Sequence, residues 1–140
     1  MKNRSFDLIV YGATSFVGQI LTRYLFEHIG VGGKVNWAIA GRSEKKLSVL
    51  KSSLGSNADS LSVIVADASD EVALTTMCQS ARVIASTVGP YALYGEPLVK
   101  ACAENGTDYC DLCGEAYWIK AMILKYSHAA KASGARIVSC

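Results

Sequence analysis

The stretch Gly12-Ala-Thr-Ser-Phe-Val-Gly18 decides the fold expected for this chain, because it follows an apolar run at residues 6–11 and opens a helical pattern. A buried strand, a glycine-bounded turn and a helix form the start of a dinucleotide-binding βαβ unit. Gly12 permits a tight turn off the strand, and Gly18 lets the helix pack closely on the sheet. The amides between them would then face a pyrophosphate at the positive end of the helix.

Ser15 departs from the usual form of this turn, in which a middle glycine lets the backbone approach phosphate closely. Two interpretations follow: the Ser15 hydroxyl donates to a phosphate oxygen, or the serine weakens phosphate binding slightly. On the first interpretation the whole turn contacts the cofactor, through Gly12, Ala13, Thr14, Ser15, Phe16, Val17 and Gly18.

Strand and helix patterns alternate from this turn to the end of the chain. Apolar residues spaced by three and four predict five helices, each following a strand. This alternation indicates the α/β class, with a doubly wound, parallel six-stranded sheet of Rossmann type in the order 3-2-1-4-5-6. The further strands are predicted at residues 35–40, 61–66, 82–87, 107–111 and 136–139.

The composition is that of one folded domain, with 140 residues, 51% hydrophobic and 19% charged. A net charge of +2, with no basic run longer than Lys45-Lys46, argues against nucleic-acid binding. No stretch approaches the roughly 20 apolar residues that cross a bilayer, and no secretory signal precedes the first strand. We therefore expect an intracellular protein, either cytoplasmic or associated with an organelle or membrane through sequence not present here.

The five cysteines do not form a recognisable framework, because their number is odd and their spacing is scattered. Cys110 and Cys113 have C-x-x-C spacing, but a zinc site needs further ligands and a redox motif needs a thioredoxin-like context. We expect reduced thiols and no metal site.

The residues after the second strand indicate which dinucleotide is bound. NAD is usually recognised by an Asp or Glu about 20 residues past the glycines, and here Arg42 and Ser43 precede the first carboxylate, Glu44. A guanidinium suits a 2′-phosphate, whereas a cation at a helix start is otherwise disfavoured by the dipole. We therefore predict that NADP is preferred and NAD is possible, the alternative being that Arg42 is simply solvated.

Residues after the third and fourth strands complete the predicted cofactor site. Asp67 either accepts from the adenine amino group or caps the next helix. The stiff turn of Val88, Gly89, Pro90 and Tyr91 is expected near the ribose or nicotinamide, because ligands lie at the carboxyl ends of strands.

Other side chains at this edge leave the chemistry open. Tyr91 and Tyr94 are expected as exposed loop aromatics that shape the nicotinamide site or pack under a further domain. Asp111 and Glu115 form a substrate-facing pair, or Glu115 caps a helix. Catalytic residues stay unknown, since Tyr117-Trp-Ile-Lys120 is one residue short of the spacing that short-chain dehydrogenases use.

Five segments of the chain carry a family resemblance: Tyr11-Gly-Ala-Thr-Ser-Phe-Val-Gly-Gln19, Trp37-Ala-Ile-Ala-Gly-Arg-Ser43, Val88-Gly-Pro-Tyr-Ala-Leu-Tyr-Gly-Glu-Pro-Leu-Val99, Ala101-Cys-Ala-Glu-Asn-Gly106 and Asp111-Leu-Cys-Gly-Glu115. Together they resemble the N-terminal NAD(P)-binding domain of the saccharopine dehydrogenase-like oxidoreductase family, and the resemblance covers nearly the whole chain. The chain is also similar to the mycobacterial trans-acting enoyl reductases, which act in lipid synthesis.

This resemblance implies an NADP- or NAD-linked oxidoreductase that transfers hydride to or from an unidentified substrate. Family members continue with a large second domain, so residues 1–140 are expected to be an NAD(P)-binding Rossmann domain, truncated or excised from its C-terminal substrate domain. The face left uncovered favours a homo-oligomer as a further possibility. The alternative function is a non-catalytic interaction or scaffold module with weakened or lost cofactor binding, because fold alone does not establish function.

Overall fold

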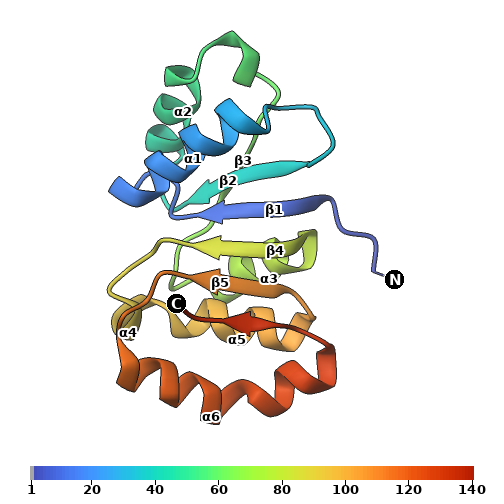
Figure 1. Cartoon of the computed structure of the whole chain (residues 1–140), viewed down its shortest axis with the longest axis vertical. Coiled ribbons are helices and arrows are strands. Elements are labelled where there is room, and N and C mark those ends of the chain that lie inside the picture. Colours follow the sequence, from blue (N-terminus) through green and yellow to red (C-terminus); the bar gives the residue numbers. More distant parts are fainter. Residues whose placement is uncertain (1) are drawn as a thin grey trace.

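Six parallel strands form one sheet in the order β3-β2-β1-β4-β5-β6, which confirms the predicted class and topology (Figure 1). The structure is a computed structural model that describes residues 2–140. The strands point to the left in Figure 1, so the carboxyl edge of the sheet is its left side. Their bounds are β1 (Phe6–Tyr11), β2 (Trp37–Gly41), β3 (Ser62–Val65), β4 (Ala81–Ser86), β5 (Asp108–Asp111) and β6 (Ile137–Val138).

The five predicted helices are present, together with two short elements that the pattern did not predict. The predicted helices are α1 (Phe16–His28), α2 (Glu44–Ser53), α3 (Glu71–Ser80), α5 (Glu96–Asn105) and α6 (Ala116–Ser133). The additional elements are α4 (Tyr91–Tyr94) and the 3₁₀ turn η1 (Ser56–Ala58), each too short to show a helical period.

Polar side chains cap two of the helices at their starts. Ser43 caps α2 by accepting a hydrogen bond from the Lys46 amide at 3.3 Å. Asp70 caps α3 by accepting from the Ala73 amide at 3.0 Å. The local sequence therefore fixes where both helices begin.

Alternate residues of the strands face opposite layers of helices. On β1, Ile9 and Tyr11 join the larger buried cluster with α3, α5 and α6, whereas Val10 joins the smaller cluster with α1 and α2. All three are buried, as the continuous apolar run of a parallel strand predicts. Helices thus cover both faces of the sheet, and the carboxyl ends of the strands are where this fold places a ligand.

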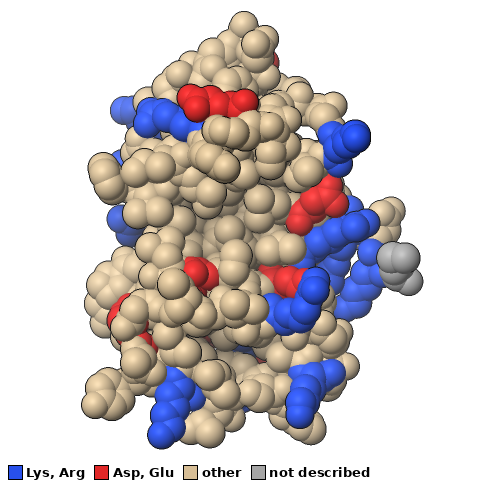
Figure 2. Space-filling model, viewed as in Figure 1, with Lys and Arg blue, Asp and Glu red and all other residues tan. Residues whose placement is uncertain are grey.

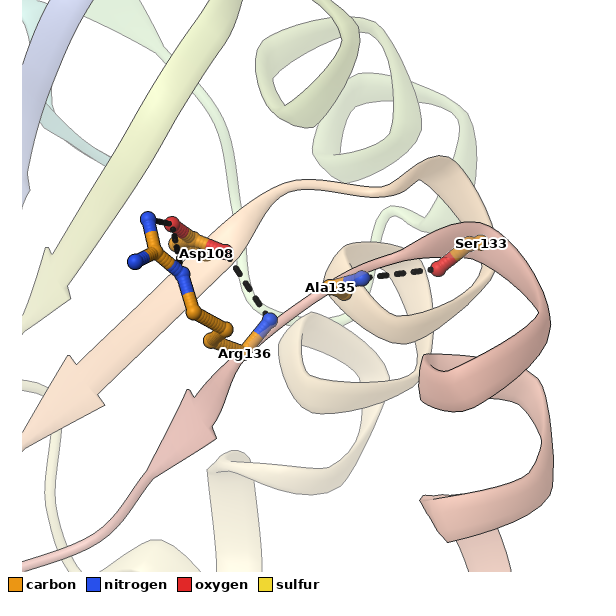
Figure 3. A network of polar contacts seen from close by, with 4 residues as sticks. All are labelled: Asp108, Ser133, Ala135 and Arg136. Carbon is orange, nitrogen blue, oxygen red and sulfur yellow. Dashed lines mark hydrogen bonds and ion pairs between the residues drawn. The ribbon is translucent and has the colours of Figure 1, made fainter.

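The short edge strand β6 pairs with β5 in the sheet, and Arg136, directly before β6, adds a charged pair with Asp108 (Figure 3). Asp108 accepts from the Arg136 amide and from its Nε, each at 2.9 Å, and also from a terminal guanidinium nitrogen. Desolvation opposes the Asp108 charge, but the hydrogen bonds from Arg136 outweigh it and lower the pKa of Asp108.

Between residues 2 and 140 no helix is long and apolar enough to cross a membrane.

Candidate functional site

The turn between β1 and α1 can be built only with glycine at both ends. Gly12 has φ +80°, and a Cβ on it would lie 2.6 Å from Cγ2 of Val88. A Cβ on Gly18 would lie 2.0 Å from the carbonyl oxygen of Gly12. The roles predicted for the two glycines, a tight turn and close packing of the helix, match this geometry.

The amides of this turn divide into those already bonded and those left open. Gly12 and Ala13 donate to the Ala40 carbonyl at 2.9 and 3.1 Å, which extends β1 onto β2. Within residues 2–140, the amides of Thr14, Phe16 and Val17 have no acceptor. Phe16 and Val17 begin α1, and 81% of the Phe16 surface is exposed. Open donors at a helix start can bind an anion.

Ser15 supports this turn and has its own partners. Its hydroxyl oxygen accepts from the Gly18 amide at 3.0 Å, so Ser15 is the N-cap of α1. The same oxygen lies 3.0 Å from the Thr87 hydroxyl, which donates to the Gly12 carbonyl at 2.8 Å. Because the one Thr87 proton points to a carbonyl, the Ser15 hydroxyl is the donor between the two. A Ser15 contact to phosphate would require this proton to leave Thr87.

Thr87 also holds this turn, although the sequence did not predict a place for it in the site. Its amide continues the β1–β4 ladder by donating to the Tyr11 carbonyl at 2.9 Å, and its side chain closes over the turn. Its hydroxyl comes directly after β4, beside Gly12 at the end of β1, and this position is the sequence signal that could have predicted its role. The turn is therefore fixed to β4 as well as to β2.

The end of β2 carries charge without a protein partner. Arg42 is exposed and, among the described residues 2–140, takes part in no ion pair. Its neighbour Ser43 is half-buried at the start of α2. The amides of Glu44 and Lys45, the first in α2, have no acceptor within the same described part. The predicted 2′-phosphate residues thus lie beside open helix-start donors.

Asp67 lies after β3, close enough to Arg42 to feel its charge. The Ser69 hydroxyl and amide donate to Asp67 at 2.7 and 2.8 Å, and these bonds lower the pKa of Asp67, with a smaller effect from Arg42. Asp70 caps α3, so the alternative that Asp67 caps this helix is wrong. The exposed carboxylate of Asp67 keeps acceptor capacity for an adenine amino group.

The segment after β4 differs from the expected exposed loop. Tyr91 begins α4 and is only 6% exposed, so the expectation of an exposed Tyr91 hydroxyl is wrong. Its hydroxyl donates to the Ser86 carbonyl at 3.0 Å, and burial raises its pKa to about 12. Tyr94 is exposed, as expected. Val88, half-buried, lies against the Gly12 turn, and Gly89 and Pro90 are exposed at the same edge.

The two acidic residues considered as a substrate-facing pair have internal partners. Glu115 accepts from the Tyr91 and Ala92 amides at 2.7 and 3.1 Å and so caps α4, a different helix from the one that follows it in sequence. Asp111 accepts from the Tyr109 hydroxyl at 2.6 Å and from the Cys113 amide at 3.0 Å. Both carboxylates therefore organise the loops at this edge.

The comparisons with known proteins agree with this geometry. The family model described as the saccharopine dehydrogenase NADP binding domain matches residues 8–138. A trans-acting enoyl reductase of Mycobacterium tuberculosis is 44% identical over 135 residues, covering 96% of this chain and 32% of the relative. A lipid droplet localized protein of Caenorhabditis elegans is 44% identical over 138 residues, with the same coverage.

Among solved structures, the apo saccharopine dehydrogenase (L-Glu forming) of Saccharomyces cerevisiae has a TM-score of 0.67. It is 18% identical, over 96% of this chain and 26% of that chain, which shows a shared fold. The chain spans about a third of the length of the curated relatives it matches.

The chain belongs to the saccharopine dehydrogenase NADP binding domain family, as its sequence segments predicted. The family's cofactor agrees with the prediction of NADP made from Arg42 and Ser43. The residues that contact it remain a prediction.

Proposed function

We propose that the chain binds NADP along the carboxyl edge of the sheet and prefers it to NAD. The supporting observation is the set of open donors at two neighbouring helix starts. Thr14, Phe16 and Val17 offer amides for the pyrophosphate, and Arg42 with Ser43 offers charge and a hydroxyl for the 2′-phosphate. Gly12 and Gly18 hold the first helix start close to the sheet.

The remaining predicted contacts follow the carboxyl edge in both directions. Asp67 would accept from the adenine amino group, and Val88, Gly89 and Pro90 would lie beside the nicotinamide ribose. Bound NADP supplies hydride chemistry, whereas the protein supplies position and electrostatics. The Tyr91 hydroxyl is buried and donates to the Ser86 carbonyl, so its role here is to hold the β4 loop.

The reaction is proposed as hydride transfer in a longer oxidoreductase. Relatives with the name trans-acting enoyl reductase make reduction of an activated carbon–carbon double bond the first reaction to assay. We propose that chain beyond these residues supplies the substrate pocket, because the relatives are about three times as long. Exposed apolar side chains at this edge, including Leu93 at 71% and Leu112 at 49%, offer a surface for it.

Calorimetric titration with NADPH and NADH tests the cofactor assignment. We expect tighter binding of NADPH, and we expect Arg42→Ala to weaken NADPH binding about 10- to 100-fold, since charge-assisted hydrogen bonds contribute about 1.5–3 kcal/mol. NADH affinity should change little. Arg82→Ala, at the amino end of β4, is the matched control.

Two outcomes would contradict the proposal. Equal affinities of the wild-type protein for NADPH and NADH would remove the assignment of Arg42 to a 2′-phosphate. No detectable binding of either dinucleotide at millimolar concentration would favour the non-catalytic scaffold module.

A further inference from the structure

A pocket of about 550 Å³ lies between α1 and α2, beside the phosphate-binding turn. Thr14 lines it from the turn, and Ser43 lines it from the end of β2. In Figure 2, basic side chains are visible along the upper left of the molecule, where Figure 1 shows these two helices. The pocket therefore connects the two regions between which an adenosine ribose lies in this fold.

Residues of α1 and α2 form the walls of the pocket, and the charged side chains among them are all basic. Arg23 follows Gln19 by one turn on α1, and Lys45 and Lys46 begin the opposing face of α2. No carboxylate is among the described residues that line it. Nor does any described partner form an ion pair with Arg23, Lys45 or Lys46. The three cations are therefore free to neutralise an anion.

The Ser43 hydroxyl also favours an anion in this pocket. The Ser43 hydroxyl oxygen accepts from the Lys46 amide, and in the described part of the chain its own proton has no acceptor. Lys45 and Lys46 lie in the first turn of α2, where the helix dipole disfavours cations. A bound anion would reverse that penalty, because it is attracted both by the cations and by the helix start.

We propose that this pocket holds the adenosine 2′-phosphate of NADP and that Arg23, on α1, is a specificity-determining residue for it together with Lys46. The inference rests on the proposed binding of NADP and adds a subsite to it. Arg42 does not line the pocket. Ser43, its neighbour in sequence, does, so this subsite adds cations of α1 and α2 to the contact proposed for Arg42.

Arg23→Gln tests this subsite, because Arg23 is exposed and forms no hydrogen bond or ion pair with residues 2–140, so its loss leaves the fold intact. The probes are NADPH against NADH, and adenosine 2′,5′-bisphosphate against 5′-AMP, measured by calorimetry. We expect NADPH and the bisphosphate to bind about tenfold more weakly, equivalent to 1.4 kcal/mol. NADH and 5′-AMP should bind as to the wild-type protein.

Two further variants sharpen the test. Lys46→Gln should reduce the same two affinities, because its charge lies in the same pocket. Lys51→Gln is the matched control, since Lys51 is on α2 but does not line the pocket. It should leave all four affinities unchanged.

The outcomes separate this inference from the proposed function. If the wild-type protein prefers NADPH and Arg23→Gln keeps the whole preference, the subsite is overturned and NADP binding stands. Equal weakening of NADPH and NADH by Arg23→Gln also overturns it, since the effect would not depend on the 2′-phosphate. A wild-type protein that binds neither dinucleotide overturns both.

Discussion

Two strand-to-helix turns meet at the carboxyl edge of the sheet, and they differ in what they leave unbonded. After β1, the amides of Phe16 and Val17 begin α1 with no acceptor in the described chain. After β4, the Tyr91 and Ala92 amides begin α4, and the Glu115 carboxylate accepts from both. The second turn completes its own hydrogen bonds, whereas the first has open donors, which we propose bind the pyrophosphate of NADP.

Charged side chains repeat this contrast between the two halves. In the half built from β4, β5 and β6, Lys125 pairs with Glu96, and Arg136 pairs with Asp108 (Figure 3). In the half built from β1, β2 and β3, Arg23 and Arg42 form no ion pair among residues 2–140. These two cations are therefore available for the phosphate in the proposed NADP site.

Gly18→Ala should disrupt the turn after β1 and have the largest effect on stability. The new Cβ would meet the Gly12 carbonyl at 2.0 Å, a backbone atom that cannot move without opening the turn. We expect the free energy of unfolding, measured in denaturant, to fall by about 3 kcal/mol or more. Gly114→Ala is the control, because nothing lies within 4 Å of its added Cβ. A loss at position 18 no larger than at position 114 would contradict the close packing of α1.

Glu115→Ala should destabilise the turn after β4 and leave the cofactor preference unchanged. Two backbone donors would lose a carboxylate acceptor, but water can replace the acceptor of the exposed Ala92 amide. We therefore expect a loss of about 2 kcal/mol in unfolding free energy, since one hydrogen bond to a charged group contributes about 1.5–3 kcal/mol. The ratio of NADPH to NADH affinity should stay unchanged. Glu44→Ala, at an exposed helix start, should change stability by less than about 0.5 kcal/mol. A changed cofactor ratio in Glu115→Ala would place Glu115 in the binding site.

Ser15→Gly should add one more free amide to the turn after β1. The variant loses the bond to Thr87 and the cap on Gly18, and we expect about 1 kcal/mol less unfolding free energy. The freed Gly18 amide should strengthen binding of NADPH and NADH by the same factor, because both carry the pyrophosphate. Weaker binding of both would instead show that the Ser15 hydroxyl contacts phosphate.

Glu96→Gln should have the smallest effect, and that effect should depend on pH. Hydrogen bonds from Lys125 and then Tyr126 lower the pKa of Glu96. Its stabilisation is therefore present above the unfolded-state pKa and lost as pH falls through the folded-state pKa. Because Lys125 is 60% exposed, screening limits the effect to less than about 1 kcal/mol.

The measurement is the difference in unfolding free energy between wild type and Glu96→Gln, taken at neutral pH and at about pH 3. The difference should shrink at the acidic pH. An equal difference at both values would mean that the Glu96 charge contributes nothing.

The fold was predictable because its signals are local and repeated. Glycines at 12 and 18, apolar runs and helix caps each specify one βαβ step, and the crossover rule supplies the strand order. The partners of Glu115 and Thr87 were not predictable, since they join residues 24 and 75 positions apart across the sheet edge. Tyr91 was placed wrongly for the same reason: a four-residue helix gives no periodic signal of burial.

The central claim is that the turn after β1 receives the pyrophosphate, and backbone NMR during titration with NADP⁺ tests it most directly. The account predicts that the amide resonances of Thr14, Phe16 and Val17 shift strongly as their open N–H groups gain acceptors. The Ala92 amide, already bonded to Glu115, should shift least among helix-start amides. Binding that leaves Phe16 and Val17 unshifted, or that shifts Ala92 most, would contradict the account.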